Sequence, residues 1–362
     1  MISISLCMIV KNEQKVLKRC LSSVKDLVDE IIIVDTGSTD NTKEIAKEFT
    51  DLIYDFEWTD DFSEARNFSF SKATKEYQLW LDASDFLEEI DRESFRKLKT
   101  HLIEEIDVVT MNHCTEFDEN GEPLNTFVRE RLVKRDKKYV WHDPVREYIN
   151  ADGVTFYADD IFIMHKKDEL DTGRDIKIYD KQIELKKDMS PRTVFFYAKE
   201  LKNHERYIES AFYFDTFLSM KSKDAEDNIE ACFELGQCYK SIGEKEKSID
   251  AFLKSFRYHG ARAEICCEIA YYFKDKQQHS TAIYWFHLAS NLEKPDTIGF
   301  MLDDYWGYIP NVELVNYCLS ASITKVSVEQ AIYHNQLAKK FKPNSKIVLH
   351  NEHNLATLLK KI

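Results

Sequence analysis

The sequence has little glycine and proline, no long apolar run and no regular cysteine spacing. Only 9 Gly and 6 Pro occur among 362 residues, which favours long regular elements, mostly helical. No apolar stretch approaches the roughly 18 to 20 residues that a spanning helix needs, and Met1-Ile2-Ser3 lacks the basic start of a signal peptide. The eight cysteines form no CxxC pair, so we expect reduced, packed thiols in a cytoplasmic protein.

The chain also lacks a positive charge excess. Its 50 Lys and Arg residues face 64 Asp and Glu residues, giving a formal net charge of −14, and no basic tail offsets it. Nucleic-acid binding through neutralisation of backbone phosphates is therefore not expected. With 43% hydrophobic and 31% charged residues the chain is globular, and its length suits about two domains.

The first half alternates short apolar runs with amphipathic helical patterns. Residues 4–10, 30–35 and 77–81 are predicted strands, and the β-α-β-α order predicts an α/β domain with a mostly parallel sheet. Ligands of such sheets bind beyond the carboxyl ends of the strands. Polar clusters follow all three strands, so we expect them to meet at one edge: Lys11-Asn12-Glu13, Asp35-Thr36-Gly37-Ser38 and Asp82-Ala83-Ser84-Asp85.

The second half is entirely helical in pattern, with weak self-similarity at about 34 to 38 residues. The pairs Tyr197-Ala198, Leu235-Gly236 and Ile269-Ala270 recur at corresponding positions. Small residues of this kind allow two helices of a hairpin to cross closely. We therefore predict an α/β domain over 1–166, a charge-dense helical linker over 167–189 and an all-α helical-repeat domain over 190–362.

Three acidic residues are candidates for ligand binding. Asp35 ends an apolar strand, where its carboxylate can accept hydrogen bonds from a nucleobase or ribose, or stabilise the turn before the next helix. Asp82 and Asp85 follow a buried strand. Carboxylates at that spacing beside a diphosphate suit a hard divalent cation, although the same pair can also form a simple turn.

Further candidates lie outside this edge in the sequence. Arg66 opens a helix, from which its guanidinium could clamp a phosphate or form a surface ion pair. Glu147 is a candidate general base, and Arg146 beside it a candidate phosphate partner. His165 ends a predicted strand as a candidate third metal ligand. Each of these side chains also fits a purely structural role.

Together, these segments resemble a family-2 glycosyltransferase of the GT-A nucleotide-sugar fold, in the branch that carries tetratricopeptide-like repeats after the catalytic domain. The resemblance spans nearly the full chain, and its first two stretches are the most specific. The match is carried by Met8-Ile9-Val10-Lys11-Asn12-Glu13, by Asp29-Glu30-Ile31 through Asp35-Thr36-Gly37-Ser38-Thr39-Asp40-Asn41-Thr42, by Asp61-Phe62 through Ala65-Arg66-Asn67, and by Leu81-Asp82-Ala83. Weaker matches include Tyr305-Trp306-Gly307-Tyr308 and Lys342-Pro343-Asn344-Ser345.

The resemblance implies a donor site. Asn12, Glu13 and Asp35 would hold the nucleoside. Arg66 would approach the donor, and Asp82 would be the first acid of the family's Asp-x-Asp motif, near ribose and metal. The donor implied is a nucleoside diphosphate sugar, a UDP-sugar in our expectation.

The metal site departs from the family pattern at two positions. Ser84 stands where relatives have the second Asp of the motif, with Asp85 one place later, and Arg146 stands where relatives commonly have His. We expect a divalent cation, Mn²⁺ or Mg²⁺, at Asp82, Asp85 and His165. Arg146 could partly replace the metal, or the two departures could together mark lost activity.

The expected reaction is inverting transfer of a sugar from the nucleoside diphosphate, with Glu147 as the base that takes the acceptor proton and Asp143 as second candidate. Some relatives with appended repeats glycosylate a peptide or protein side chain, including Cys of ribosomally made antimicrobial peptides. Because stacked helical hairpins form a groove suited to peptides, we expect a peptide or protein acceptor docked on the repeats.

Two other acceptors and one other class of protein remain open, and a further class is disfavoured. The acceptor could instead be a cell-surface polysaccharide or a lipid-linked precursor. The chain could also be a non-catalytic repeat scaffold with a residual nucleotide-sugar site. A nucleotidyltransferase would want a Gly-rich, basic phosphate loop after the first strand, and Lys11-Asn12-Glu13-Gln14 is not one.

Overall fold

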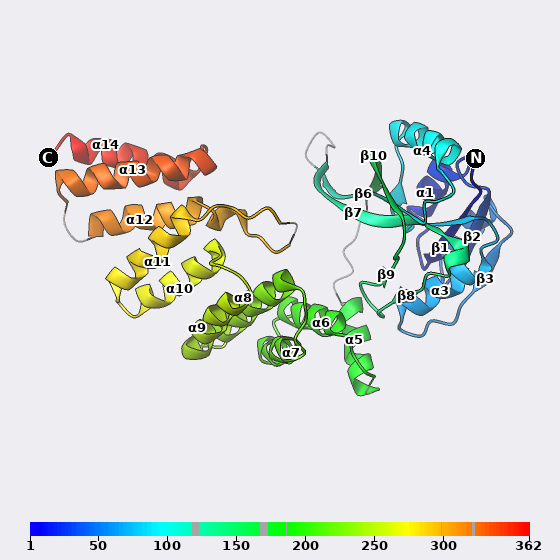
Figure 1. Cartoon of the computed structure of the whole chain (residues 1–362), viewed down its shortest axis with the longest axis horizontal. Helices are drawn as coiled ribbons and strands as arrows, with labels where there is room; N and C mark the ends of the chain where they lie inside the picture. The colour runs from blue at the N-terminus through cyan, green and yellow to red at the C-terminus, as the bar shows by residue number, and fades with distance from the viewer. Residues whose placement is uncertain (118–122, 167–172, 186, 298, 321–322) are drawn as a thin grey trace. The chain divides into compact units, whose positions relative to one another are not determined.

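The structure, a computed structural model, describes residues 1–117, 123–166, 173–185, 187–297, 299–320 and 323–362 (Figure 1). It divides into two units, Met1–Asp188 and Met189–Ile362. Part of the predicted linker, residues 167–172 and 186, lies outside the described residues.

The first unit is built on an eight-stranded sheet in the order β3-β2-β1-β4-β7-β6-β10-β5. Strands β5 and β7 run antiparallel to their neighbours, and the other strands share one direction. The predicted mostly parallel sheet is confirmed. Its strands are β1 (Ile4–Val10), β2 (Glu30–Asp35), β3 (Ile53–Asp55), β4 (Tyr77–Trp80), β5 (Asp85–Phe86), β6 (Val108–Phe117), β7 (Pro123–Lys134) and β10 (Thr155–His165).

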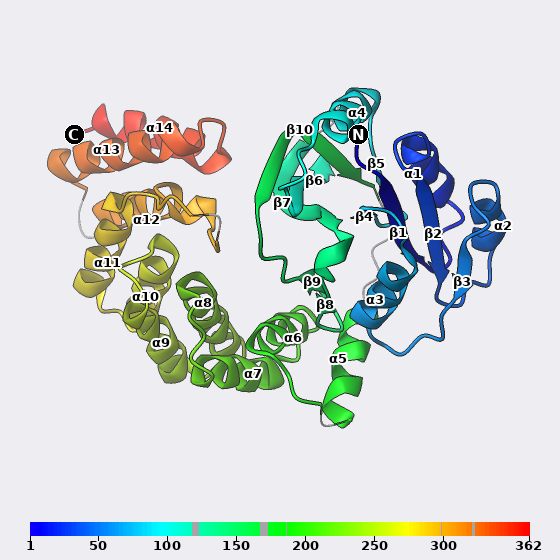
Figure 2. The same ribbon diagram turned by 45° about the vertical axis from the view of Figure 1, so that its right-hand side comes forward.

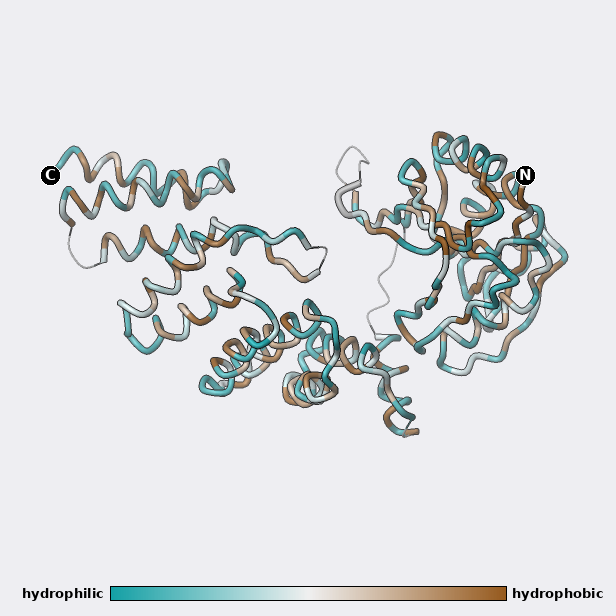
Figure 3. Tube along the Cα trace, viewed as in Figure 1, coloured by the Kyte–Doolittle hydropathy of each residue, from teal (hydrophilic) through white to brown (hydrophobic). Residues whose placement is uncertain are grey.

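Helices and a short ribbon cover the two faces of this sheet (Figure 2). One core joins the sheet to α1 and α4, and a second core on the opposite face joins it to α3 and a two-stranded ribbon. Figure 3 shows hydrophobic residues running along the strands at the centre of this unit. The covering elements are α1 (Leu17–Val24), α2 (Thr42–Lys47), α3 (Phe62–Lys72), α4 (Glu89–His101), and the ribbon of β8 (Trp141–His142) and β9 (Tyr148–Ile149).

The strand ends follow from the sequence. β1 and β2 are almost entirely buried, as expected for strands covered on both faces, and each ends at a polar turn. Helix α3 begins after Asp61, whose carboxylate accepts the backbone N–H of Glu64. The parallel register pairs Val10 with Asp35, which places the carboxyl ends of β1 and β2 side by side.

One helix of the predicted linker belongs to the first unit. Helix α5 (Arg174–Glu184) contacts the loop before α3, because the Lys181 ammonium pairs with the Asp60 carboxylate. The Gln182 side chain also donates to the Asp60 carbonyl at 3.3 Å. The boundary between the units follows this helix, at Asp188 and Met189.

The second unit is all helical, as predicted. Its helices are α6 (Pro191–Asn203), α7 (Tyr207–Ser219), α8 (Ala225–Ser241), α9 (Lys245–Lys254), α10 (Ala263–Asp275), α11 (His279–Asn291), α12 (Tyr308–Ser320), α13 (Lys325–Phe341) and α14 (Lys346–Leu359). Short 3-10 turns lie at Arg135–Lys137 in the first unit and at Ser255–Arg257 and Asp303–Tyr305 in the second.

The repeat shows in how the hairpins close. The Ser210 hydroxyl of α7 donates to the Ala198 carbonyl at 2.7 Å, and the Ser248 hydroxyl of α9 donates to the Gly236 carbonyl at 2.8 Å. A Cβ at Gly236 would lie 2.3 Å from the Phe252 ring, so the crossing of α8 and α9 requires glycine there. The small residues singled out in the sequence therefore lie where paired helices meet.

The turns between paired helices repeat as well. Glu205, Gly243 and Gln277 follow α6, α8 and α10, and their φ angles are 59°, 82° and 59°. Only glycine occupies this left-handed region without steric cost. The three hairpins thus share one turn conformation, with glycine at only one of them.

The turn conformation predicts different effects for two glycine substitutions in the second unit. Gly243→Ala should lower the free energy of unfolding by about 1 kcal/mol, because alanine is strained at positive φ although open space surrounds the site. Gly260→Ala is the control, since its Cβ would also meet open space without a positive φ. Urea denaturation of both variants checks this, and equal stability would contradict it.

Candidate active site

The loops after β1 and β2 are tied together at the carboxyl edge of the sheet. The Asn12 backbone N–H donates to the Ser38 hydroxyl at 2.9 Å, and the Asn12 side-chain oxygen accepts the Thr39 N–H at 2.8 Å. The Glu13 N–H donates to the Thr42 hydroxyl at 2.7 Å. Asn12 has a φ of 56°, a conformation that Asn tolerates better than most residues. Hydrogen bonds therefore join the two predicted nucleoside-binding loops, one after β1 and one after β2, at the carboxyl edge of the sheet.

Asp35 shapes the turn at this edge. Its carboxylate is 1% exposed and accepts the N–H groups of Gly37 at 3.2 Å and Ser38 at 3.0 Å. Gly37 has a φ of 101°, which favours glycine at this position of the turn. The Lys43 ammonium lies 3.6 Å from the carboxylate. The structure thus gives Asp35 a clear role in holding the turn, and nucleoside binding by this residue stays a prediction.

Arg66 of α3 lies between two of the predicted site carboxylates. Its Nη2 donates to Asp82 Oδ1 at 2.7 Å, and its Nε donates to Glu147 Oε1 at 2.6 Å. The Arg66 guanidinium also lies over the rings of Trp80 and Trp141, 4.9 and 4.8 Å from their centroids. Residues 81 positions apart in the sequence are therefore joined through one side chain.

The surroundings of Arg66 keep its charges in place. Burial alone would raise the pKa of Asp82, but the positive charge and hydrogen bond of Arg66 hold it below its usual value. Burial would lower the pKa of Arg66, but Glu147 and Asp82 raise it overall. The Asp82 side chain is still 35% exposed, whereas that of Arg66 is 7% exposed. A ligand can reach Asp82 but not the whole guanidinium.

Asp85 lies in a different set of contacts. It is fully buried, and its Oδ2 accepts Arg131 Nη1 at 2.9 Å and the Asp82 N–H at 3.0 Å. Its Oδ1 lies 2.8 Å from Nδ1 of His165 and 3.5 Å from Nε2 of His113. The two acids expected to share one ion therefore face different partners.

The charges around Asp85 determine its ionisation. Burial would raise the pKa of Asp85, but Arg131 and the two histidines hold it well below its usual range. Burial lowers the pKa of His113. The pKa of His165 is instead raised, because the nearby Asp85 carboxylate outweighs burial. Asp85 is thus an anion at neutral pH.

Asp85, His113 and His165 can offer three ligand atoms to a metal ion, all within 4.8 Å of one another. Both ring nitrogens of His113 are buried without a well-formed hydrogen bond, so either nitrogen is available to bind an ion. Imidazole nitrogens are poor ligands for Mg²⁺ and better ligands for transition-metal ions. The residues present therefore fit a divalent transition-metal ion, and the expected set of Asp82, Asp85 and His165 stays a prediction.

The ribbon of β8 and β9 carries the remaining predicted residues in its turn. Asp143 and Arg146 both have left-handed backbones, with φ of 68° and 54°. Arg146 is exposed at this turn, whereas the neighbouring Glu147 reaches Arg66. The Pro144 carbonyl accepts the N–H of Phe62 at the start of α3. Strained backbone of this kind collects at functional sites, and Glu147 of this turn joins the network around Arg66.

Three site residues were missed by the sequence analysis: His113 of β6, and Arg129 and Arg131 of β7. A signal was present, because Arg129-Glu130-Arg131 interrupts an otherwise apolar strand run, and Arg131 is 0% exposed. A charged residue in such a run is rarely buried without a partner. That signal indicates an internal ion pair but does not identify Asp85 as the partner.

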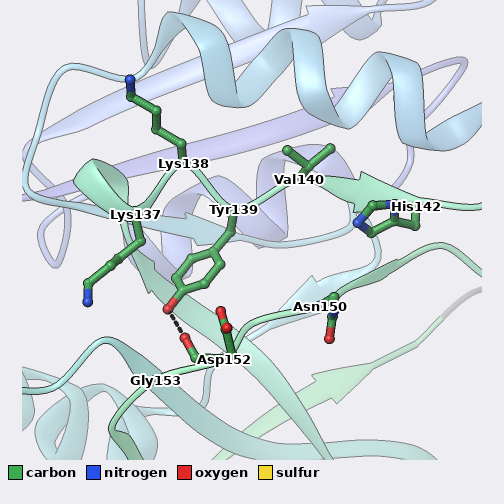
Figure 4. Close-up of a pocket in the computed structure, with 8 residues that line it drawn as sticks. All are labelled: Lys137, Lys138, Tyr139, Val140, His142, Asn150, Asp152 and Gly153. Carbon is green, nitrogen blue, oxygen red and sulfur yellow. Dashed lines mark hydrogen bonds between the residues drawn. The ribbon is translucent and has the colours of Figure 1, made fainter.

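A cavity of about 510 Å³ lies beside the 3-10 turn and the β8–β9 ribbon (Figure 4). None of the predicted site residues lines it. Its lining residues are Lys137, Lys138, Tyr139, Val140, His142, Asn150, Asp152 and Gly153. Trp141, next to His142, instead packs on Trp80 at a centroid distance of 5.1 Å, on the side of Arg66.

The first unit carries a mostly parallel sheet with a charged edge, and the second unit consists of paired helices. Residues 5–152 match the family model described as "Glycosyl transferase family 2".

Several relatives share parts of the chain. A TPR repeat-containing protein of Synechococcus elongatus is 47% identical over 102 residues, covering 28% of this chain and 25% of that protein. The SPbeta prophage-derived glycosyltransferase SunS of Bacillus subtilis is 30% identical over 207 residues, covering 53% of this chain and 48% of SunS. The matches thus span a quarter to about half the length of these relatives.

Among solved structures, TarS residues 1–349 of S. aureus in complex with UDP-GlcNAc is 14% identical. The comparison covers 76% of this chain and 92% of that one, with a TM-score of 0.39. Within the described residues, none of the helices has both the length and the apolar character needed to cross a membrane.

The cluster around Asp85 predicts which variants lose metal binding. His113→Ala should weaken Mn²⁺ binding at least tenfold, roughly the loss that removal of an outer partner of a ligand already causes. Asp82→Asn should leave Mn²⁺ affinity nearly unchanged, because Asp82 is paired with Arg66. Electron paramagnetic resonance of free Mn²⁺ measures both. If Asp82→Asn loses Mn²⁺ binding and His113→Ala keeps it, the metal ligands are instead Asp82, Asp85 and His165.

Proposed function

We propose that this chain transfers a sugar from a nucleoside diphosphate sugar to a peptide or protein acceptor, with inversion at the anomeric carbon. The observation that carries the proposal is the pairing of Asp82 and Glu147 on Arg66 at the carboxyl edge of the sheet. The match of residues 5–152 to the glycosyl transferase family 2 model supports glycosyl transfer as the reaction class. The resemblance of the sequence to that family suggests uridine as the base.

The donor would lie along the edge formed by the first two loops. Asn12 and Glu13 are part of the hydrogen-bonded loop pair, and Asp35 holds the turn beside them. We propose that this edge holds the nucleoside, with Asp82 next to the ribose. Asp82 has the exposure that such a contact needs.

The reaction needs a base and a place for developing negative charge. Glu147 would take the proton of the acceptor nucleophile as that atom attacks the anomeric carbon, with Asp143 as the second candidate. The bond between the anomeric carbon and the diphosphate oxygen breaks, and its electron pair stays on the departing diphosphate. A divalent cation held by Asp85, His113 and His165 would supply positive charge for that diphosphate.

The acceptor proposal rests on the repeats. Lysines and glutamates pair between first helices of successive hairpins, as in Lys240–Glu268 at 2.7 Å and Lys274–Glu313 at 2.6 Å. Lys199–Glu230 and Lys202–Glu234 form the same pairing one hairpin earlier. This polar ladder favours a peptide or protein over a lipid-linked precursor, because it offers charges and hydrogen bonds. Eight free cysteines suit the reducing cytoplasm that we propose as its location.

A non-catalytic scaffold is the competing function. It is favoured by Ser84, which stands where the family has an acid and whose backbone carbonyl accepts the Lys166 N–H at 3.1 Å. Serine is a weak ligand, so this position supplies little to a cation. The exposed Arg146 is itself a cation and supplies no ligand to a metal ion either.

Release of nucleotide from sugar donors separates these two functions. The full chain, incubated with UDP-, GDP- and dTDP-sugars and Mn²⁺, should slowly hydrolyse one of them with water as acceptor. Asp82→Asn should abolish the release, whereas Asp136→Asn, an exposed acid of the same unit, should not change it. A wild-type chain that binds these donors but releases no nucleotide would be the scaffold.

The base assignment makes a separate prediction. Glu147→Gln should slow this release by about 100-fold or more, because the amide cannot accept the proton. The glutamine oxygen can still accept the Arg66 Nε–H, so donor affinity should stay close to that of wild type. Asp143→Asn is the comparison, and a large loss of rate there, with full activity in Glu147→Gln, would make Asp143 the base.

A further inference from the structure

Three arginines gather around the ring of Trp80, the residue that ends β4. The Cζ atoms of Arg131, Arg66 and Arg129 lie 3.9, 4.9 and 5.5 Å from the centroid of a Trp80 ring. The Trp80 indole N–H donates to the Glu130 carbonyl between two of these arginines, which holds the ring in place. Trp80 thus forms a fixed surface on which the three guanidinium groups stack.

Two of these three cations are neutralised within the site. Arg66 pairs with Asp82 and Glu147, and Arg131 pairs with Asp85. Together these pairs use every carboxylate of the cluster.

Arg129 is the third cation. Within the described part of the chain its guanidinium forms no hydrogen bond and no ion pair, and its one recorded contact is the Trp80 ring. The side chain is half-buried. Burial and the neighbouring charges of Arg131 and Arg66 lower the pKa of Arg129. The guanidinium nevertheless stays charged at neutral pH.

An arginine in this position has a physical cost that a ligand can remove. A half-buried cation without a counterion loses hydration and receives no ion pair in return. Two further arginines next to it increase the repulsion, and the nearby carboxylates of Asp82 and Glu130 only partly offset it, because the pKa of Arg129 is still lowered. The site is therefore complete in charge only when an anion joins it.

We propose that Arg129 binds the diphosphate of the nucleotide sugar and stabilises it as the leaving group. The proposal rests on the proposed function. A guanidinium presents paired N–H donors that match two phosphate oxygens, which suits a diphosphate better than a single point charge would. Arg66 and Arg131 are less suited, since each would have to give up a buried carboxylate partner.

This role places Arg129 at the bond that breaks. As the bond between the anomeric carbon and the diphosphate oxygen breaks, the electron pair remains on that oxygen and the charge of the diphosphate grows. A fixed cation nearby lowers the energy of this state without any movement of a proton. Arg129 would supply part of the charge that Ser84, at the position of the family's second acid, does not bring through a metal.

The test compares binding of UDP and UMP, which differ by one phosphate. Isothermal titration of the full chain in chelator should show UDP bound more tightly than UMP. Arg129→Gln should weaken UDP binding at least tenfold, roughly the loss of one hydrogen bond to a charged group. UMP binding should stay unchanged, and Arg129→Lys should lie between the two. Arg257→Gln, the same change at an exposed arginine of the second unit, should bind like wild type.

The outcomes separate this proposal from the proposed function. If wild type binds UDP but Arg129→Gln binds it equally well, or loses UDP and UMP alike, Arg129 does not bind the diphosphate and the proposed function stands. If wild type binds none of UDP, GDP and dTDP, the proposed function fails and this inference with it. If thermal unfolding shows that Arg129→Gln is not folded, Arg129→Lys decides, and wild-type UDP affinity in it together with unchanged UMP affinity overturns the proposal.

Discussion

Arg66 holding Asp82 and Glu147 is the contact on which the site depends. It joins the helix α3, the loop after β4 and the turn of the β8–β9 ribbon, three parts of the chain with no other common partner among the hydrogen bonds described above. A buried guanidinium with two carboxylates is stable because neither acid could remain charged there alone. Removing Glu147, whose side chain is 13% exposed, is expected to cost about 3 to 5 kcal/mol, as for one partner of a buried ion pair. The arrangement of the reacting groups is therefore also part of what folds this edge of the sheet.

The same rule explains why the site has two halves. Each carboxylate lies next to its own arginine: the partly exposed Asp82 next to Arg66 of α3, and the buried Asp85 next to Arg131 of β7. The two halves share Trp80, whose ring contacts both arginines. One half faces the bond that we propose is broken, and the other carries the histidines that could hold an ion. The division follows from electrostatics in a low-dielectric environment rather than from the spacing of acids in the sequence.

Much of the edge could be predicted from the sequence because it depends on local signals. Strands β1 and β2 are continuous apolar runs ended by polar turns, so their ends and the loops at Asn12 and Asp35 were placed correctly. The crossing at Gly236 was also readable, because a small residue recurred at the repeat spacing. His113 and Arg129 could not be placed this way. They reach the site through antiparallel pairing of β6 with β7, whose register shifts between Val109 and Thr110, and such shifts leave no local pattern.

The burial of Asp85 bears on how loss-of-function variants of this chain would be read in a genetic screen. Its carboxylate neutralises Arg131 in the interior of the sheet. Any neutral side chain at position 85 would therefore leave the Arg131 cation buried without its carboxylate partner. A defective allele there would lower the amount of intact protein in the cell before it altered any chemistry. Position 82, at the solvent-facing side of the same loop, is where an allele would report on turnover instead.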